Sequence, residues 1–381
     1  MPTASESSRE GALMQTWIDE QTRSKAAALA PVVRALAAGG PAVQVRAEPD
    51  SDSRPADLQL DDSACATSEE AIAALQAAWP EINRPGTVRI GGIGRFVLDE
   101  VASAKKAGRL GGRVCLVTGA AQGFGEGIAR ELAQAGGVLV IADLNLPLAQ
   151  SVARSLNEQF GPGTALAVGV DVGSETSVAE MVTETVLTFG GIDLLVSNAG
   201  VLRAGGLEDM TLDTFEFVTR INYTAFFLVT KYGSRPMKLQ ARFDPSYAAD
   251  IVQINSKSGL EGSNRNFAYA GGKFGGIGLV QSFAKELVTD RVKVNAICPG
   301  NYYEGPLWSD PEKGLFVQYL SAGKVPGAQS VDDVYRFYID KVPMRRGCSP
   351  LDVTRAILYC VEQAYETGQA IPVTGGQNML K

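Results

Sequence analysis

The stretch RVCLVTGAAQGFGEGIARELAQAGGVLVIAD, residues 113–143, decides the fold class of this chain. It begins with an apolar run at Arg113–Thr118, passes through a glycine-rich turn into an amphipathic run at Phe124–Ala135, and returns to an apolar run at Val138–Ala142. Short apolar runs predict buried strands, and the amphipathic run predicts a helix between them. A glycine-rich turn between a strand and a helix lets a pyrophosphate approach the backbone at the helix N-terminus. The stretch therefore predicts a dinucleotide site.

The turn and the acid that ends the second strand favour NAD over NADP. Asp143 stands where a carboxylate accepts hydrogen bonds from both ribose hydroxyls and repels a 2′-phosphate. No arginine or lysine follows in Asp143-Leu144-Asn145, and Gln122 carries no charge. The cofactor-binding residues expected in this unit are Gly119, Gln122, Gly123, Phe124, Gly125, Asp143 and Leu144.

The alternation of apolar and amphipathic runs continues to the end of the chain. Strand-like runs are Arg113–Thr118, Val138–Ala142, Ala165–Val170, Ile192–Ser197, Ile251–Asn255, Val292–Ala296 and Ala370–Val373. Helical runs are Phe124–Ala135, Pro147–Gln159, Glu175–Phe189, Leu212–Lys231, Phe267–Val288 and Pro350–Glu362. Apolar strands that alternate with helices predict a parallel sheet covered on both faces. The predicted fold class is α/β, a doubly wound, Rossmann-type parallel sheet of about seven strands.

Residues 1–110 differ in pattern and predict an N-terminal extension before a catalytic domain at residues 111–381. The extension would be small and either α/β or mostly helical. Three roles stay open for it: a relic of a fused enzyme, an oligomerisation arm, or a lid over the pocket. Its expected elements are a helix near Gly11–Ala38, a strand at Ala42–Ala47, a polar loop at Glu48–Ser63, a helix at Ser68–Trp79, a strand at Thr87–Ile93 and a helix at Phe96–Ala107.

The composition excludes several chemistries. The 381 residues contain no histidine, which rules out a Ser-His-Asp triad, a Cys-His pair and the usual histidine-containing zinc sites, and no metal is expected. Proton transfer near neutral pH must then use Tyr, Lys, Cys or a carboxylate with a shifted pKa. A net charge of −7 argues against nucleic acid as a partner, and no apolar run is long enough to span a membrane.

The cysteines and the N-terminus favour a cytoplasmic protein. The five cysteines are odd in number, widely spaced and form no CxxC motif, so reduced thiols are expected. The segment Met1–Gly11 shows no apolar core of a signal peptide.

Further motifs follow the glycine-rich turn in a fixed order. They are Asp171-Val172, Ser197-Asn198-Ala199-Gly200, Asn222, Ser256 and Tyr269-Ala270-Gly271-Gly272-Lys273. Ser256 lies 13 residues before Tyr269, and Lys273 lies four after it. In this order and spacing, residues 111–381 resemble the short-chain dehydrogenase/reductase family.

The catalytic chemistry of this set needs no histidine. Tyr269 and Lys273 at i, i+4 share one face of a helix. The ammonium of Lys273, together with the positive nicotinamide of an oxidised cofactor, would favour the phenolate and lower the pKa of Tyr269. Tyr269 would take the alcohol proton as hydride leaves for the nicotinamide. Ser256 would hydrogen-bond the reacting oxygen and stabilise its developing charge.

The family resemblance implies further roles. Lys273 would also hold the nicotinamide ribose, next to Tyr269, and Asn222 would anchor a water that relays protons. Two departures are Ser197, where the family usually has asparagine, and Glu304, where many members have a threonine that contacts the carboxamide. The remaining cofactor contacts that the resemblance implies are Asp171 and Val172 at the adenine, Asn198, Ala199 and Gly200 at the middle of the cofactor, and Pro299 and Gly300 at the nicotinamide.

A narrower resemblance concerns the substrate. Five parts of the second half resemble members of the family that oxidise a phosphorylated hexitol, such as sorbitol 6-phosphate, to the ketose with NAD. They are Ile254–Gly259, Lys273–Gly276, Gly300-Asn301, Tyr338–Pro343 with Arg345–Cys348, and Thr374–Gln377. A phosphate needs cationic or backbone donors, and Lys257 is the favoured cation because it directly follows Ser256. The expected substrate residues are Lys257, Asn255, Asn301 and Arg345, although each cation alone is also consistent with a solvated surface charge and each asparagine with a structural cap.

Two alternatives remain. One keeps the chemistry and changes the substrate to an unphosphorylated polyol or another secondary alcohol. The other is a non-catalytic, NAD-sensing assembly protein, which the intact Asn222, Ser256, Tyr269 and Lys273 argue against. The resemblance also implies a homo-dimer or homo-tetramer, with a small molecule as the partner.

Overall fold

The computed structural model describes residues 17–38, 43–50, 55–82, 85–101, 107–321 and 323–379. The chain separates into two compact units. One consists of Met1–Val101, Thr183–Gly191 and Leu239–Tyr247, and the other of Ala102–Val182, Ile192–Lys238 and Ala248–Lys381. Among the described residues, no helix is both long enough and apolar enough to cross a membrane.

The larger unit is built on a seven-stranded sheet in the order β11-β10-β9-β8-β5-β6-β7. All neighbouring strands run parallel, which confirms the predicted doubly wound α/β fold. Every residue of β5, β8, β9 and β10 is buried, because helices cover both faces. The strands are β5 Val114–Thr118, β6 Val138–Asp143, β7 Ala165–Gly169, β8 Leu194–Ser197, β9 Ala249–Ile254, β10 Val292–Pro299 and β11 Ala370–Val373.

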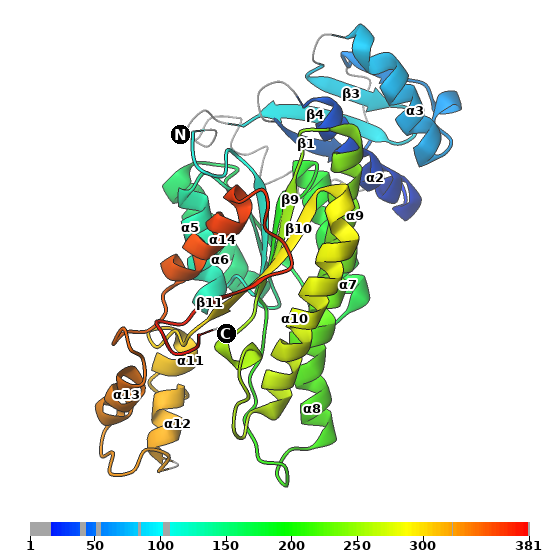
Figure 1. Ribbon diagram of the computed structural model, residues 1–381. Coiled ribbons are helices and arrows are strands. Elements are labelled where there is room, and N and C mark those ends of the chain that lie inside the picture. Colours follow the sequence, from blue (N-terminus) through cyan, green and yellow to red (C-terminus); the bar gives the residue numbers. More distant parts are fainter. Residues whose placement is uncertain are drawn as a thin grey trace. The chain divides into compact units, whose positions relative to one another are not determined.

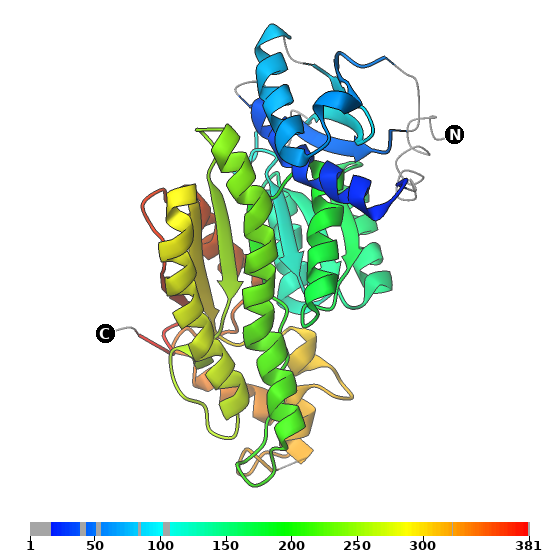
Figure 2. The same ribbon diagram turned by 90° about the vertical axis from the view of Figure 1, so that its right-hand side faces the viewer.

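Helices cover both faces of this sheet (Figure 1). The helices α5 (Gly123–Gln134), α6 (Leu146–Phe160) and α14 (Pro350–Glu362) cover one face. The helices α7 (Glu175–Phe189), α9 (Ala225–Phe243) and α10 (Phe267–Leu287) lie side by side over the other (Figure 2). The strand order reverses between β5 and β8, and ligands of such sheets bind outside the carboxyl ends at this switch point.

The single helix predicted at Leu212–Lys231 is wrong in one respect. The structure has α8 at Leu212–Thr219, a π-helical turn at Arg220–Thr224, and α9 after it. A π turn inserts one residue into the helical ladder, often at functional sites, and the 3.6-residue hydrophobic period does not reveal it.

A helical segment between β10 and α14 was not predicted from the sequence. It contains α11 (Pro306–Ser309), α12 (Leu315–Ser321) and α13 (Val331–Asp340), drawn in orange in Figure 1. Its core is aromatic: the ring of Trp308 lies 4.9 Å from that of Tyr303 and 5.1 Å from that of Phe316, between centroids. We call residues 303–342 the aromatic lobe.

The smaller unit has a four-stranded sheet in the order β1-β4-β3-β2, with β2–β3 parallel and the other pairs antiparallel. An extension containing helices and strands is thus confirmed. Its elements are α2 Glu20–Leu36, β1 Val43–Glu48, β2 Leu58–Leu60, α3 Ser68–Ala78, β3 Thr87–Ile90 and β4 Gly94–Glu100.

Two expectations for the smaller unit are corrected. The helix predicted at Phe96–Ala107 is the strand β4 over its first residues, where Phe96 is fully buried and pairs with Ala47 and Val88. Burial in a sheet overrode the helical pattern of that short run. The polar loop predicted at Glu48–Ser63 contains the strand β2. Residues 11–16, 42, 51–54 and 102–106, where parts of the predicted elements fall, lie outside the described residues.

Candidate active site

The four expected catalytic residues come from three elements at the carboxyl ends of the strands. Ser256 follows the end of β9 and opens a short 3-10 turn, where its Oγ accepts a hydrogen bond from the N–H of Ser258 at 3.1 Å. Tyr269 and Lys273 lie on the first turns of α10, so their side chains share one face. Asn222 lies in the π-helical turn.

Lys273 is buried beside Tyr269. Its side chain is 4% exposed, and Nζ donates a hydrogen bond to the carbonyl oxygen of Ile254 at 2.9 Å. Nζ lies 5.5 Å from the centroid of the Tyr269 ring. Burial lowers the pKa of Lys273 to about 8, and the Cys298 thiol opposes this shift. The ammonium is therefore still the main form at neutral pH.

Tyr269 differs from the expectation for its pKa. Burial raises the pKa of Tyr269, and a hydrogen bond with Ser256 acts in the opposite direction. The loss of hydration destabilises the phenolate more than the hydrogen bond with Ser256 stabilises it. The protein residues alone therefore do not lower the pKa of Tyr269, and the expected lowering would need the positive charge of the bound nicotinamide.

Asn222 holds the π-helical turn and leaves one atom unpaired. Its Nδ2 donates hydrogen bonds to the carbonyl oxygens of Val201 at 2.7 Å and Val218 at 2.9 Å. Its Oδ1 is buried and has no hydrogen-bond partner among the described residues. A Cβ at Gly200 would lie 2.9 Å from this oxygen, so any larger residue there would crowd it. A buried acceptor of this kind suits an ordered water.

The glycine-rich turn fits a dinucleotide. Gly119 and Gly123 have positive φ angles of 64° and 63°. A Cβ at Gly125 would lie 2.0 Å from the carbonyl oxygen of Gly119, so the helix can approach the strand only with glycine there. A Cβ at Gly123 would meet nothing within 4 Å. Gln122 caps α5 without a side-chain hydrogen bond, which leaves the first amides of the helix for a phosphate.

The acid expected at the ribose is held in place by two backbone amides. Asp143 accepts hydrogen bonds from the N–H of Ala121 at 3.0 Å and of Asn145 at 2.9 Å. The neighbouring Leu144 is 77% exposed, which gives an apolar surface next to this carboxylate. Asp171 is exposed, and Val172 beside it is 8% exposed.

Asn198 ties the glycine-rich turn to β8. Its Nδ2 donates hydrogen bonds to the carbonyl oxygens of Thr118 at 2.9 Å and Gly119 at 3.1 Å. The N–H groups of Asn198 and Ala199 both donate to Oγ1 of Thr118 at 3.1 Å. The structure therefore brings this motif and the turn together.

One aromatic contact at the cofactor side was missed by the sequence reasoning. Pro299 ends β10, and the N–H of Gly300 donates to the carbonyl oxygen of Val373 at 2.9 Å. Two residues further on, Tyr302 packs against Phe124 of the glycine-rich turn, with ring centroids 5.0 Å apart. The position of Tyr302 shortly after Pro299, in the loop expected at the nicotinamide, is the sequence signal that could have identified it.

The two cations expected at the substrate, Lys257 and Arg345, differ in their exposure to solvent. Lys257 is half-buried next to Ser256, and burial lowers its pKa, with Glu261 opposing and Lys341 reinforcing the shift. Arg345 is exposed and pairs with Asp340.

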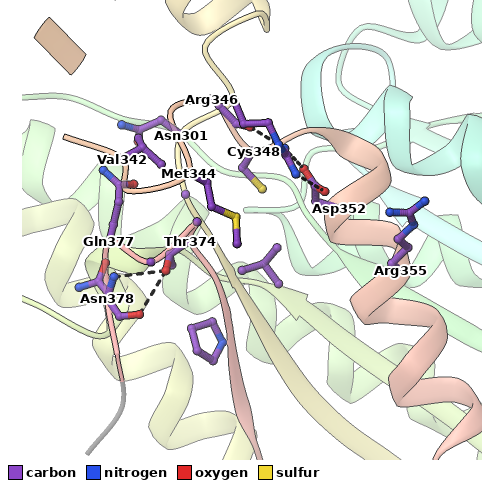
Figure 3. Close-up of a pocket in the computed structure, with 16 residues that line it drawn as sticks. Asn301, Val342, Met344, Arg346, Cys348, Asp352, Arg355, Thr374, Gln377 and Asn378 are labelled. Atoms are coloured by element: carbon purple, nitrogen blue, oxygen red, sulfur yellow. Dashed lines mark hydrogen bonds and ion pairs between the residues drawn. The ribbon is translucent and has the colours of Figure 1, made fainter. Parts of the chain in front are cut away.

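Both expected asparagines have protein partners. Asn301 lines a pocket of about 420 Å³ (Figure 3). Its Nδ2 donates to the hydroxyl of Tyr303 at 3.1 Å. Asn255 is 3% exposed, and both of its amide atoms are hydrogen-bonded inside the protein. Both amide atoms of Asn255 thus bond within the protein, as the structural alternative for this residue expects.

Comparison with known proteins places this arrangement in a family. A family model described as short chain dehydrogenase matches residues 113–309. Sorbitol-6-phosphate 2-dehydrogenase of Escherichia coli is 36% identical over 274 residues, which are 70% of this chain and 99% of that protein. The 3-oxoacyl-(acyl-carrier-protein) reductase FabG of Aquifex aeolicus is 33% identical over 270 residues, 70% of this chain and 98% of that protein.

A solved structure agrees with these matches. The crystal structure of sorbitol-6-phosphate 2-dehydrogenase SrlD from Erwinia amylovora has a TM-score of 0.63 and 36% sequence identity, and the match covers 70% of this chain and 100% of that one. The chain therefore belongs to the short-chain dehydrogenase family, whose members are oxidoreductases that act on CH–OH groups with a nicotinamide cofactor.

Proposed function

We propose that this protein oxidises a phosphorylated hexitol, such as sorbitol 6-phosphate, to the ketose with NAD. The observation that carries this proposal is Lys257, a half-buried cation directly beside Ser256. The similarity to sorbitol-6-phosphate 2-dehydrogenase supports the substrate class, since it extends over 99% of that protein.

A group of cations around Lys257 supports a phosphate ligand. Burial lowers the pKa of Lys324, and Arg265 and Lys341 lower it further. Burial lowers the pKa of Lys257, Glu261 raises it, and Lys341 has a smaller lowering effect, so Lys257 faces both a carboxylate and a second cation. A phosphate dianion would relieve this repulsion and accept their hydrogen bonds. Arg265 is partly neutralised by Asp209 at 2.8 Å, which leaves the three lysines as the main donors.

NAD is the proposed cofactor because of Asp143. The two backbone amides fix its carboxylate at the end of β6, where it would accept hydrogen bonds from the ribose hydroxyls. No cation follows in the next two residues, so a 2′-phosphate would meet a negative charge without compensation.

The proposed mechanism assigns one task to each catalytic side chain. Ser256 donates a hydrogen bond to the substrate oxygen, and the phenolate of Tyr269 removes its proton as the C–H bond breaks. When bound, an oxidised nicotinamide would supply the hydride acceptor and a positive charge that favours this phenolate. The Lys273 ammonium stabilises the negative charge of the phenolate. The unpaired Oδ1 of Asn222 would hold a water through which the proton leaves.

Three further proposals concern the protein as a whole. We propose a homo-oligomer, a dimer or tetramer, because Phe227 on α9 and Phe274 on α10 are 42% and 47% exposed. We propose a cytoplasmic location because the cysteine pattern favours reduced thiols. Size-exclusion chromatography with light scattering tests the oligomer. We also keep residues 1–110 as a separate extension, and deleting them shows whether residues 111–381 remain active.

The test of the substrate uses sorbitol 6-phosphate and sorbitol side by side. With NAD, the wild-type enzyme is expected to reduce the cofactor far faster with the phosphate ester. Lys257→Gln should raise KM for sorbitol 6-phosphate at least tenfold and leave the weak reaction with sorbitol unchanged. Lys285→Gln on the exposed part of α10 is the matched control and should change neither. No NADH from sorbitol 6-phosphate, or equal rates with both polyols, would overturn the proposal.

A further inference from the structure

Asn255 connects two backbone groups that belong to catalytic residues. Its Oδ1 accepts a hydrogen bond from the N–H of Ser256 at 2.8 Å. Its Nδ2 donates to the carbonyl oxygen of Lys273 at 2.9 Å, across 18 residues of sequence. A backbone N–H can only donate and a carbonyl can only accept, so the two partners fix the orientation of the amide.

A second amide and two glycines complete this arrangement. Oε1 of Gln253, itself 2% exposed, accepts from Nδ2 of Asn255 at 2.8 Å. A Cβ at Gly259 would lie 2.1 Å from Oδ1 of Asn255, and a Cβ at Gly276 would lie 2.5 Å from Nε2 of Gln253. The glycines therefore make the room in which the two side chains sit between β9 and α10.

Lys273 returns a hydrogen bond in the opposite direction. Its Nζ donates to the carbonyl oxygen of Ile254, while its own carbonyl receives the amide of Asn255. The end of β9 and the catalytic turn of α10 are thus joined twice. The N–H of Asn255 also donates to the carbonyl of Ile297 on β10 at 2.7 Å, which anchors the junction to the sheet.

We propose that Asn255, supported by Gln253, is a positioning residue that sets the distance between Ser256 and the Tyr269–Lys273 pair. This inference rests on the roles proposed above for those three residues. Both amide atoms of Asn255 bond within the protein and the residue is 3% exposed, so it would act through Ser256 and Lys273 and not by binding the substrate. The amide bridge fixes the strand end and the helix turn, so the serine hydroxyl and the tyrosine hydroxyl reach the same substrate oxygen. A displacement of about 1 Å at such a site can cost on the order of a hundredfold in rate.

The main test compares Asn255→Ala and Asn255→Asp with the wild-type enzyme. Both variants lose the donor to the Lys273 carbonyl, so kcat with NAD and sorbitol 6-phosphate should fall about 10- to 100-fold. KM for the polyol and the Kd of NADH, measured by fluorescence, should stay within about twofold of wild type. The pH profile of kcat should also shift, because the surroundings of Lys273 and Tyr269 change.

Hydrogen–deuterium exchange provides a readout that needs no substrate. Asn255→Ala removes the acceptor of the Ser256 N–H, so the peptide containing that amide should exchange faster. Asn255→Asp keeps an acceptor there and should retain the protection, although it loses the bond to α10. Failure of the wild type on sorbitol 6-phosphate would overturn the proposed function, while the exchange result would still decide the bridge.

A matched control and a double-mutant cycle separate positioning from stability. Asn157 makes three similar hydrogen bonds, to Thr164 and Ala165, far from this site. Asn157→Ala should lower thermal stability with kcat unchanged. Gly259→Ala should reduce kcat at least tenfold in the wild type and add much less than that to Asn255→Ala, because the clash with Oδ1 at 2.1 Å has gone and only the contact of 3.1 Å with the Lys273 carbonyl oxygen is left.

Three results would overturn the inference. A kcat within twofold of wild type in Asn255→Ala would show that the bridge is only structural. A selective rise of KM for the polyol would make Asn255 a substrate ligand after all. Full additivity of Gly259→Ala and Asn255→Ala would show that the two residues do not act through the same contact.

Discussion

Replacing Lys273 by methionine should abolish turnover and, at neutral pH, stabilise the fold. Burial lowers the pKa of Lys273 from an ordinary value of 10.5 to about 8. One pKa unit corresponds to about 1.4 kcal/mol, so holding the ammonium in this site costs about 3 kcal/mol relative to the unfolded chain. Methionine fills a similar volume without charge.

A lost hydrogen bond reduces the expected gain. Methionine leaves the carbonyl oxygen of Ile254 without the donor at 2.9 Å, at a cost of about 1–2 kcal/mol. The free energy of unfolding of Lys273→Met at pH 7 should therefore exceed that of wild type by about 1–2 kcal/mol. The gain reflects a site in which charge is kept for catalysis at the expense of stability.

The pH dependence has a definite sign. Below pH 8 both folded and unfolded wild-type chains carry the proton on Lys273, so the penalty is fully present. Between pH 8 and 10.5 only the unfolded chain keeps the proton on this lysine. The free energy of unfolding of the wild type therefore rises with pH relative to that of the variant. The advantage of Lys273→Met should shrink above pH 8 and be gone by about pH 10.

Urea unfolding followed by circular dichroism, at one protein concentration and several pH values, measures this difference. Groups common to both proteins cancel in the comparison. Lys293→Met is the matched control, because this buried lysine has a carboxylate partner, Asp250, at 3.1 Å. Removing one partner of a buried pair should destabilise the protein by about 3–5 kcal/mol. A Lys273→Met variant that is less stable at pH 7, or whose advantage does not change up to pH 10, would refute the reasoning.

The remaining predictions concern proton transfer and the cofactor. Tyr269→Phe should lower kcat by about 10²–10⁴-fold because the proton acceptor is lost, while NADH fluorescence titration shows retained binding; turnover close to wild type would contradict the assignment. Asp143→Ala should reduce the preference in kcat/KM for NAD over NADP by about tenfold or more, and an unchanged ratio would remove Asp143 from the ribose site. Gly125→Ala should raise the Kd of NADH at least tenfold, since its Cβ would lie 2.0 Å from the Gly119 carbonyl. Gly278→Ala, which meets nothing within 4 Å, should leave that Kd unchanged.

Most of the fold could be predicted from local pattern. The seven strands of the larger unit lie within a few residues of the apolar runs, because a strand buried on both faces must be apolar throughout. The aromatic lobe and the strand at Phe96 were not predicted. Their helices and pairing depend on contacts with residues distant in the sequence, such as Trp308 with Phe316 and Phe96 with Ala47.

For the candidate site, the sequence by itself determined which residue types are present and how they are spaced. The spacing of Tyr269 and Lys273 and the position of Asp143 can be read from the sequence alone, and the family resemblance that these motifs carry led to alcohol oxidation with a nicotinamide cofactor. Only the tertiary structure decided that Asn255 bonds to the Lys273 carbonyl and that burial moves the pKa of Tyr269 upward. The physical reason is that desolvation and hydrogen bonds between β9 and α10 arise from the packing of distant segments, which sequence spacing does not contain.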